Sequence, residues 1–381
     1  MGEPLKKLLD AQAVHQAAVH LQRCVPRFDA QRFVQLATGG LEALELMARA
    51  LHICAALEAT LPADFDTAAD ALQAALASPL PDGSPLAGLQ HGLQGWMLWP
   101  LGEYIARHGQ DHPERALQAL HALTQRFTAE FAIRPFIARH PELTFATLQR
   151  WATDDSAHVR RLVSEGSRPR LPWGMRLKSL VADPSPTLPL LRALQDDPSA
   201  YVRRSVANHL NDIAKDHPQV LVQWLQQHLP LAPAPRRALL RQASRTLIKA
   251  GNAQVLQAWG LGAAFKGGAA LKVTPARVAL GDTVTLTLHL QSTARSAQTL
   301  HIDCVLHHVK AHGGTSPKVF KGWQIELPAA GTVTLTKRHS VRPITTRRYH
   351  AGRHGVDVQI NGRMVAQGSF VLSLPQAASP R

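Results

Sequence analysis

The chain has 381 residues and carries 42 Lys and Arg against 27 Asp and Glu, a formal net charge of +15. This length is too great for one ordinary core, so the sequence predicts two domains, or a repeat array with an appendage. Residues 1–120 carry a net charge of −5 and residues 121–381 carry +20. The second part therefore favours a polyanionic partner such as DNA, RNA or an anionic membrane, although generic solubilising charge is an alternative.

Several classes of protein are disfavoured at once. The three cysteines, Cys24, Cys54 and Cys304, are few and far apart, and no Cys or His spacing suits a zinc site. We therefore expect a reducing compartment, no metal and no cofactor. No window has the uninterrupted apolar length of a membrane helix, and the N-terminus has no apolar signal-peptide core. We expect a cytoplasmic, soluble monomer that does not bind a membrane.

Residues 1–260 are predicted to form an all-α domain, because apolar residues recur there with helical spacing between Pro, Gly and Asp breaks. The segment 154–161 (DDSAHVRR) returns as 196–204 (DDPSAYVRR), so that Arg161 and Arg204 are 43 residues apart. Such a period is typical of HEAT-like helix pairs stacked in a solenoid with one concave face. Further degenerate copies are predicted at 126–131 and 240–249.

A Gly- and Ala-rich linker is predicted over residues 261–270, and the hydrophobic period changes after it. Apolar and polar residues alternate over 284–290, 332–336 and 356–360, and the last of these runs ends at Asn361-Gly362. A period of two predicts half-buried strands, and Asn-Gly predicts a tight turn. Together with a final strand at 370–372 and a corner tyrosine at Tyr349, this pattern predicts an immunoglobulin-like β-sandwich over residues 271–375.

Residues four apart share one face of a helix, and three predicted inner helices have a polar face of this kind. These faces read Arg126, Glu130 and Arg134; Arg161 and Glu165; and Arg204, Asn208 and Asp212. Each Arg/Glu pair alone could be an ordinary surface ion pair of little energetic value. The three together are harder to explain in that way, because a carboxylate in a nucleic-acid groove weakens binding. The acids Glu130, Glu165 and Asp212 are therefore candidate catalytic residues.

The segment after Glu165 adds an aromatic candidate. Residues 168–173 read RPRLPW, so the second helix is expected to end near Pro169 and to be followed by a rigid basic loop that carries Trp173. A lone tryptophan is often core filler. In this basic, proline-bounded setting it is also suited to pack against a sugar or a cationic base.

Three long segments resemble the AlkC family of DNA alkylation repair proteins, which is related to the AlkD-type HEAT-like glycosylases. They are 124–136 (TQRFTAEFAIRPF), 159–173 (VRRLVSEGSRPRLPW) and 201–213 (YVRRSVANHLNDI). The resemblance covers essentially the whole helical part. It implies hydrolysis of the N-glycosidic bond of 3-methyladenine and 3-methylcytosine in duplex DNA without the full base flipping of most such enzymes. It implies the catalytic set Glu130, Glu165, Trp173 and Asp212.

That chemistry suits carboxylates. A cationic base needs no general acid to leave, and bond cleavage develops positive charge on the sugar, which nearby carboxylates stabilise. Our hypothesis assigns the attacking water to Glu165 and the electrostatic role to Glu130 and Asp212. DNA contacts are predicted for a larger set, namely Arg126, Arg134, Arg160, Arg161, Arg168, Arg170, Arg203, Arg204, Asn208, Arg241, Arg245, Arg347, Arg348 and Arg353. The alternative is a HEAT-like scaffold that binds nucleic acid or protein without chemistry.

Overall fold

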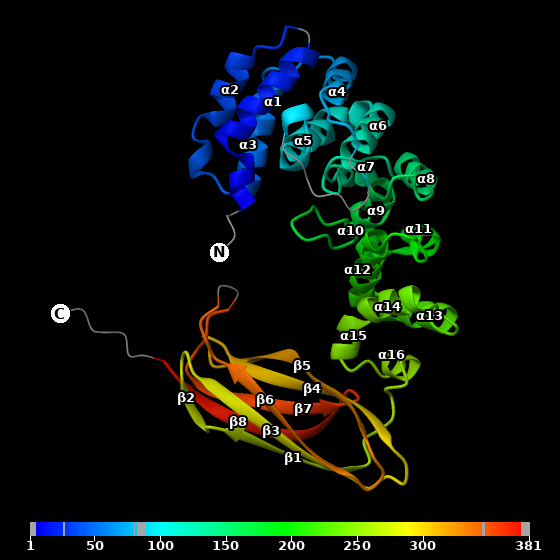
Figure 1. The fold of residues 1–381 in the computed structure, drawn as a ribbon, viewed down its shortest axis with the longest axis vertical. Coiled ribbons are helices and arrows are strands. Elements are labelled where there is room, and N and C mark those ends of the chain that lie inside the picture. The colour runs from blue at the N-terminus through cyan, green and yellow to red at the C-terminus, as the bar shows by residue number, and fades with distance from the viewer. Residues whose placement is uncertain (1–4, 26, 80, 82–88, 345–346, 375–381) are drawn as a thin grey trace, which may run out of the picture. The chain divides into compact units, whose positions relative to one another are not determined.

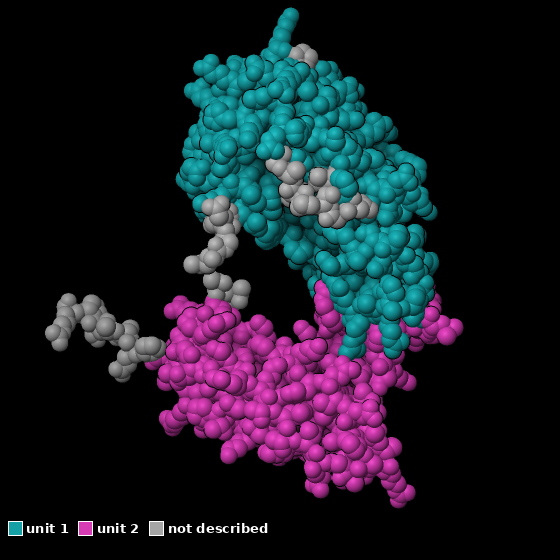
Figure 2. Space-filling view, viewed as in Figure 1, with its two compact units in different colours: residues 1–217, 232–243 teal, residues 218–231, 244–381 magenta. Residues whose placement is uncertain are grey.

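The computed structural model of this protein describes residues 5–25, 27–79, 81, 89–344 and 347–374. The chain divides into two compact units, residues 1–217 with 232–243 and residues 218–231 with 244–381 (Figure 2). The first unit is helical, and the second contains two β-sheets and three helices. The predicted fold class is confirmed. The predicted sandwich boundary at residue 375 lies outside the described residues.

The first unit opens with helices that contain none of the predicted site residues. Aspartates at N-cap positions start three of them: Asp10, Asp29 and Asp64 each accept a hydrogen bond from a backbone N–H of the first turn. The elements are η1 (Leu5–Leu9), α1 (Ala11–Cys24), α2 (Ala30–Thr38), η2 (Leu41–Ala43), α3 (Leu46–Glu58), α4 (Phe65–Ala74), η3 (Leu89–His91), η4 (Gly95–Met97), α5 (Leu98–His108), η5 (Gly109–Asp111) and α6 (Pro113–Thr124).

The repeat helices continue this unit as a curved row in which α8 and α11 lie on the outer side and α9 and α12 on the inner side (Figure 1). Apolar side chains of the inner helices are buried, with Leu162 and Val163 on α9 and Val202 and Val206 on α12. The elements are α7 (Arg134–Arg139), α8 (Pro141–Trp151), α9 (Ala157–Gly166), α10 (Lys178–Ala182), η6 (Ser185–Thr187), α11 (Leu188–Leu194), α12 (Ala200–Asp216) and α14 (Ala234–Ala243).

The repeated sequence forms the same turn twice. The carboxylate of Asp154 accepts a hydrogen bond from the Ser156 N–H before α9, and the carboxylate of Asp197 accepts one from the Ser199 N–H before α12. Arg160 then donates to the carbonyls of residues 154 and 155, and Arg203 donates to those of residues 197 and 198. The repeat is therefore a structural one, and its arginines fix the turns between paired helices.

The prediction that Arg126, Glu130 and Arg134 share a helix face is wrong. Helix α6 ends at Thr124, turns follow, and α7 begins at Arg134 with Pro135 in its first turn. A proline within a continuous helix would lose a hydrogen bond and clash with the preceding turn, so the chain breaks before it. Glu130 therefore lies in the connection between α6 and α7. Of the three predicted inner helices, only α9 and α12 are related by the 43-residue repeat.

The second unit contains a three-stranded sheet in the order β1-β3-β6 and a five-stranded sheet in the order β2-β8-β7-β4-β5. Two apolar clusters hold residues of both sheets, and Tyr349 is buried in one of them. The predicted strands at 284–290, 332–336, 356–360 and 370–372 are all present. The strands are β1 (Gly267–Thr274), β2 (Arg277–Ala279), β3 (Thr283–Ser292), β4 (Gln298–Val309), β5 (Thr315–Leu327), β6 (Thr332–Ser340), β7 (Gly352–Ile360) and β8 (Arg363–Ser373).

The predicted linker over 261–270 is too long, because Gly267 already pairs with Ser292 as the start of β1. Helices α13 (Pro218–His228), α15 (Arg245–Lys249) and α16 (Ala253–Ala258) belong to the second unit, although the helical domain was predicted to run to residue 260. Gly251 lies so close to the turn after β7 that a Cβ would stand 3.0 Å from the Gly362 carbonyl oxygen. Only glycine fits such an approach, which ties the last helices to the sandwich.

Candidate active site

A cavity of about 270 Å³ on the first unit brings together three of the four predicted catalytic residues. Glu130, Glu165 and Trp173 line it. They come from the α6–α7 connection, the end of α9 and the loop after α9. Part of the wall is aromatic, and Trp99 and Phe131 stack at 5.1 Å between ring centroids. The remaining lining residues are Trp96, Phe127, Thr128, Arg168, Leu171 and Pro172.

Arg168 joins two of the predicted acids. Its Nη1 is 2.5 Å from Glu165 Oε1, and its Nε is 2.8 Å from Asp212 Oδ2. The Lys215 ammonium binds the other Asp212 oxygen at 2.8 Å. Asp212 is 1% exposed and is absent from the cavity wall. Of the three acids, Asp212 therefore reaches the cavity only through Arg168.

Arg161 forms an ion pair with Glu130, as Arg168 does with Glu165 and Asp212. The pair joins α9 to the α6–α7 connection, and Arg161 Nη2 lies 3.8 Å from Glu165 Oε1. Thr128 Oγ1 accepts from Arg161 Nη1 at 2.8 Å and donates to Glu130 Oε2 at 2.7 Å. The Arg161 guanidinium also stands over the Tyr201 ring at 5.4 Å. The acids are thus held by arginines from other elements, and the predicted pairing of Arg126 with Glu130 does not occur in the structure.

Glu165 is ionised in this setting. Burial by itself would raise the pKa of its carboxyl, but Arg161, Arg168 and a hydrogen bond from Ser205 bring the pKa below its usual value. Ser205 Oγ donates to Glu165 Oε2 at 2.6 Å from α12. A carboxylate of lowered pKa is a poor proton acceptor but a permanent negative charge. Glu165 is therefore better suited to stabilise a cation and orient a water than to act as a strong base.

Trp173 stands at the mouth of the cavity in a strained conformation. Its side chain is 67% exposed, and its backbone φ is +64°, a region that non-glycine residues seldom adopt. The loop that carries it projects from the inner side of the row between α9 and α10 (Figure 1). An exposed indole held beside two carboxylates is suited to stack on a sugar or base. The predicted basic loop with a presented tryptophan is present.

Three of the predicted DNA-contacting arginines make internal bonds: Arg134 and Arg168 are buried, and Arg160 is half-buried. Arg134 is 0% exposed and binds two backbone carbonyls. Arg160 donates to both Asp197 carboxylate oxygens besides its turn carbonyls. Arg168 lies between Glu165 and Asp212. A phosphate contact by any of these guanidinium groups would compete with bonds that the folded chain already makes, and their DNA contacts stay a prediction.

The other predicted DNA contacts of the first unit differ in their surroundings. Arg204 on α12 is exposed. Arg126 donates to the carbonyls of residues 77 and 122, Arg170 pairs with Asp216 at 2.6 Å, and Asn208 accepts from Gln242. Arg203 fixes its turn as described, Arg161 pairs with Glu130, and Arg241 is half-buried on α14. No DNA contact of any of these residues is established by the geometry, and each stays a prediction.

In the second unit the predicted basic residues are mostly accessible. Arg348 and Arg353 are exposed, and Arg353 Nε donates to Ser369 Oγ at 3.0 Å. Arg347 is half-buried and hydrogen-bonds the ring of His308. Burial and Arg347 together lower the pKa of His308 to about 3, so this histidine is neutral. Arg245, at the start of α15, is half-buried.

The sequence reasoning missed the aromatic wall and Ser205. Trp96 and Trp99 belong to η4 and α5, far along the chain from the acids, and nothing in their spacing marks them as site residues. The run Trp96, Met97, Leu98, Trp99 reads as ordinary helical core. Ser205 follows Arg204 in the repeat motif itself, so inspection of the remaining polar residues in that motif could have found it.

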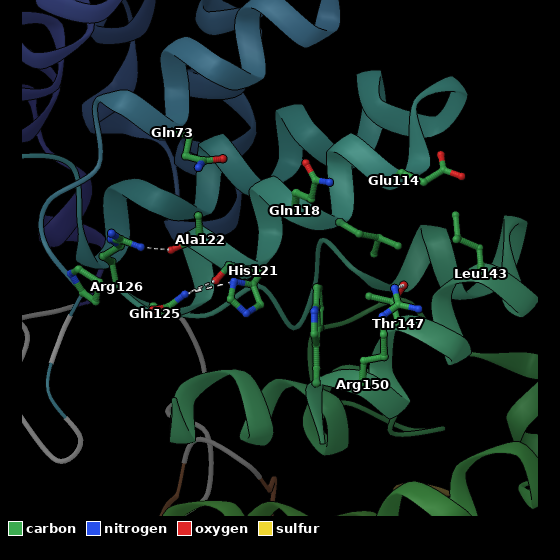
Figure 3. Close-up of a pocket in the computed structure, with 13 residues that line it drawn as sticks. Gln73, Glu114, Gln118, His121, Ala122, Gln125, Arg126, Leu143, Thr147 and Arg150 are labelled. Atoms are coloured by element: carbon green, nitrogen blue, oxygen red, sulfur yellow. Dashed lines mark hydrogen bonds between the residues drawn. The ribbon is translucent and has the colours of Figure 1, made fainter. Parts of the chain in front are cut away.

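A larger cavity of about 740 Å³ lies elsewhere on the first unit, between α4, α6 and α8 (Figure 3). The ring of His121 lies 5.2 Å from that of Trp151, and Arg150 donates to Thr147 Oγ1 at 2.9 Å. Of the predicted site residues only Arg126 lines this cavity, and its guanidinium donates to the Ala122 carbonyl (Figure 3). Size therefore does not identify the site, because the predicted acids lie at the smaller cavity.

Within the described ranges, no group of three or more His, Cys, Asp or Glu could hold a metal ion. Over the same part of the chain, every helix is too short or too polar to cross a membrane.

The architecture is that of a helical-repeat protein with an immunoglobulin-like domain. The family described as "Uncharacterised protein YhaZ, C-terminal Ig-like domain" matches residues 268–374. "Uncharacterized protein YhaZ" of Bacillus subtilis (strain 168) is 34% identical over 366 residues, which are 94% of this chain and 97% of that protein. The solved structure of Pseudomonas fluorescens alkylpurine DNA glycosylase AlkC bound to DNA containing an abasic site analog is 36% identical, with a TM-score of 0.88, over 97% of this chain and 100% of AlkC.

The chain therefore belongs to the AlkC/YhaZ family. The resemblance proposed from the three sequence segments is confirmed by this match over nearly the whole length.

Proposed function

We propose that this protein is a DNA glycosylase that excises cationic alkylated bases, 3-methyladenine and 3-methylcytosine, from duplex DNA by hydrolysis of the N-glycosidic bond. The observation that carries the proposal is the cavity that Glu130 and Glu165 line together with an aromatic wall, with Trp173 at its mouth. Similarity to an alkylpurine DNA glycosylase over the whole chain supports the same reaction class.

The chemistry follows from charge. As the bond to a cationic base breaks, positive charge moves from the base to the deoxyribose, and the base leaves as a neutral molecule. Glu165 and Glu130 supply fixed negative charge beside that sugar, and Glu165 holds the water that adds to the sugar carbon. Once bonded to the sugar cation the water is strongly acidic, so even the weakly basic Glu165 carboxylate can take its proton and pass it to solvent, and an abasic site remains. Asp212 contributes by keeping Arg168 in place, so its effect on Glu165 is indirect.

The aromatic wall suits the leaving group. A cationic ring is attracted to the faces of Trp and Phe side chains, and this attraction weakens once the base becomes neutral. The donors that line the cavity, Arg168, Thr128 and the tryptophan indole N–H groups, are too weakly acidic to protonate a leaving base near neutral pH, so a neutral base would lack help in leaving. As the family resemblance implies, we expect excision without full base flipping.

The test compares two bases of the same shape. Duplex DNA containing 3-methyladenine, or its neutral isostere 3-deaza-3-methyladenine, is incubated with the protein, and the free base is measured by mass spectrometry. We expect release of the cationic base at least about 100-fold faster than of the neutral one, because the site offers no general acid to protonate a neutral leaving group. Equal release of both would contradict the charge argument. No release of either above the spontaneous rate would remove the proposed activity.

A further inference from the structure

The sequence made Arg134 a candidate for DNA contact, but its buried position favours a structural role. It is among the largest fully buried side chains of the described chain and begins α7. Its Nη1 donates to the Gly166 carbonyl at 2.8 Å, and its Nε donates to the Met175 carbonyl at 2.5 Å. These carbonyls stand before and after Trp173, so one guanidinium ties together both ends of the loop that carries the tryptophan.

The packing around this tie is close. A Cβ on Gly166 would lie 2.6 Å from Ile133 Cγ2, so glycine alone lets the end of α9 approach the start of α7. A Cβ on Gly174 would stand 3.0 Å from Leu171 Cδ2 and 3.4 Å from Arg134 Cδ. The chain turns sharply at this point, because Trp173 has a positive φ and the Gly174 N–H reaches back to the Leu171 carbonyl at 3.3 Å. A strained turn of this kind persists only where its surroundings hold it.

We infer that Arg134 is a positioning residue that holds Trp173 at the mouth of the cavity, and that it acts on excision through the loop without touching DNA. The inference rests on the proposed function for its effect on excision, and on geometry alone for its effect on the loop. The arginine geometry is essential, because lysine has a single nitrogen and cannot reach two carbonyls in the plane of a guanidinium. Its charge also faces the carbonyl end of α9, where a cation is favoured.

The chain offers a matched control. Arg49 is 1% exposed and likewise donates to backbone carbonyls, those of residues 6, 9, 42 and 44, but it belongs to the helices before α4. Arg134→Lys and Arg49→Lys therefore remove the same kind of buried, carbonyl-bound guanidinium. Any general cost of such a change to folding appears in both variants, whereas an effect on the Trp173 loop appears only in the first.

The first experiment needs no DNA. The full chain is labelled with 5-fluorotryptophan, and the Trp173 signal is assigned from its loss in Trp173→Phe. We expect one sharp fluorine resonance for Trp173 in the wild type and in Arg49→Lys, and a shifted or broadened one in Arg134→Lys while other tryptophan signals remain. An unchanged Trp173 resonance in folded Arg134→Lys would overturn the inference, whatever the protein catalyses.

The second experiment is a double-mutant cycle on single-turnover release of 3-methyladenine. Arg134→Lys alone is expected to slow release about 10-fold or more, because small displacements of a positioning group cost that much, with DNA affinity within about 3-fold. In a Trp173→Ala background, Arg134→Lys should cause no further loss, since the two residues act in series. Independent, multiplicative losses would contradict action through Trp173. Release absent in the wild type itself would sink the proposed function and leave the fluorine result standing.

Discussion

The arginines of the helical unit and those of the sandwich carry the same charge in different surroundings. In the helical unit, Arg134 and Arg168 are buried and Arg160 is half-buried, and all three donate hydrogen bonds to backbone carbonyls or carboxylates. In the sandwich, Arg348 and Arg353 are exposed. A basic sequence therefore does not locate a phosphate-binding surface by itself, because part of its charge can neutralise acids that the fold has buried.

The two regions should consequently respond to different measurements. Changes around the cavity are expected to alter the rate of excision or the stability of the helices. Changes on the sandwich are expected to alter DNA affinity and its dependence on salt. A variant of one region that changes the property assigned to the other region would contradict this division.

Glu165→Gln has the largest expected effect. The variant keeps the shape of the side chain but removes the negative charge opposite the developing cation, so single-turnover release should fall about 100-fold. Affinity for duplex DNA should stay equal or rise, since one anion is lost near the groove. If DNA affinity falls together with the release rate, Glu165 has a structural role and the separation between cavity and sandwich residues is wrong. Circular dichroism and thermal unfolding provide the check on folding.

Arg160→Ala tests the structural role of the repeat arginines. The change leaves the buried Asp197 carboxylate without its partner, so the free energy of unfolding should fall by about 2 kcal/mol or more. Affinity for DNA in the folded state should change little. Denaturant unfolding measures the first quantity and fluorescence anisotropy the second. A large loss of affinity with unchanged stability would restore Arg160 as a phosphate contact.

The pH dependence reports on Glu165. Its pKa is below the usual value in the folded chain, so the ion pairs with Arg161 and Arg168 contribute stability above the unfolded pKa. That contribution is lost as pH falls through the folded pKa. We expect release to stay nearly constant from about pH 8 to 5 and to fall only below the ordinary glutamate range. Spontaneous loss of the base, measured without protein, is subtracted at each pH.

Ser205→Ala extends the same measurement. Removing the hydroxyl that donates to Glu165 takes away one cause of the lowered pKa. The pH at which the release rate begins to fall should therefore be higher in the variant. At pH 7 the rate should fall less than about 10-fold, because the Glu165 carboxylate keeps its ion pairs with Arg161 and Arg168. A fall that begins at the same pH as in the wild type would show that Ser205 does not tune the carboxylate.

The sandwich variants have the smallest expected effect. Arg348→Ala with Arg353→Ala should weaken DNA binding several-fold and reduce the slope of log affinity against log salt by up to about 2, one for each phosphate contact. The excision rate at saturating protein should be unchanged. A slower rate at saturation would place these residues in the chemistry, and an unchanged salt slope would remove them from the DNA surface.

The sequence predicted the fold well because its signals are local. Alternation along 284–290 reveals β3, and the repeated turn reveals the helix pairs, since each pattern depends on neighbours in the chain. Strand β4 was missed although Leu300, Ile302 and Cys304 alternate with His301 and Asp303; its burial on both faces from Leu300 to Leu306 is a tertiary property that this alternation does not reveal.

The site was predicted less completely because burial and pairing are tertiary properties. Arg134 and Arg204 look alike in sequence, yet one is enclosed and the other exposed. The spacing of Arg126, Glu130 and Arg134 is compatible with one helix face and also with a turn before a proline. Pro135 was the one local signal against a continuous helix. The aromatic wall comes from elements distant in sequence, so no local pattern could place it beside the acids.

The most direct test of the central claim is single-turnover release of 3-methyladenine from methylated duplex DNA by the wild type and by Glu165→Gln, both at saturating protein. We predict release by the wild type far above the spontaneous rate and a loss of about 100-fold in the variant with DNA binding retained. Equal rates in the two proteins, or no release by the wild type, would contradict a reaction driven by the carboxylates of this cavity.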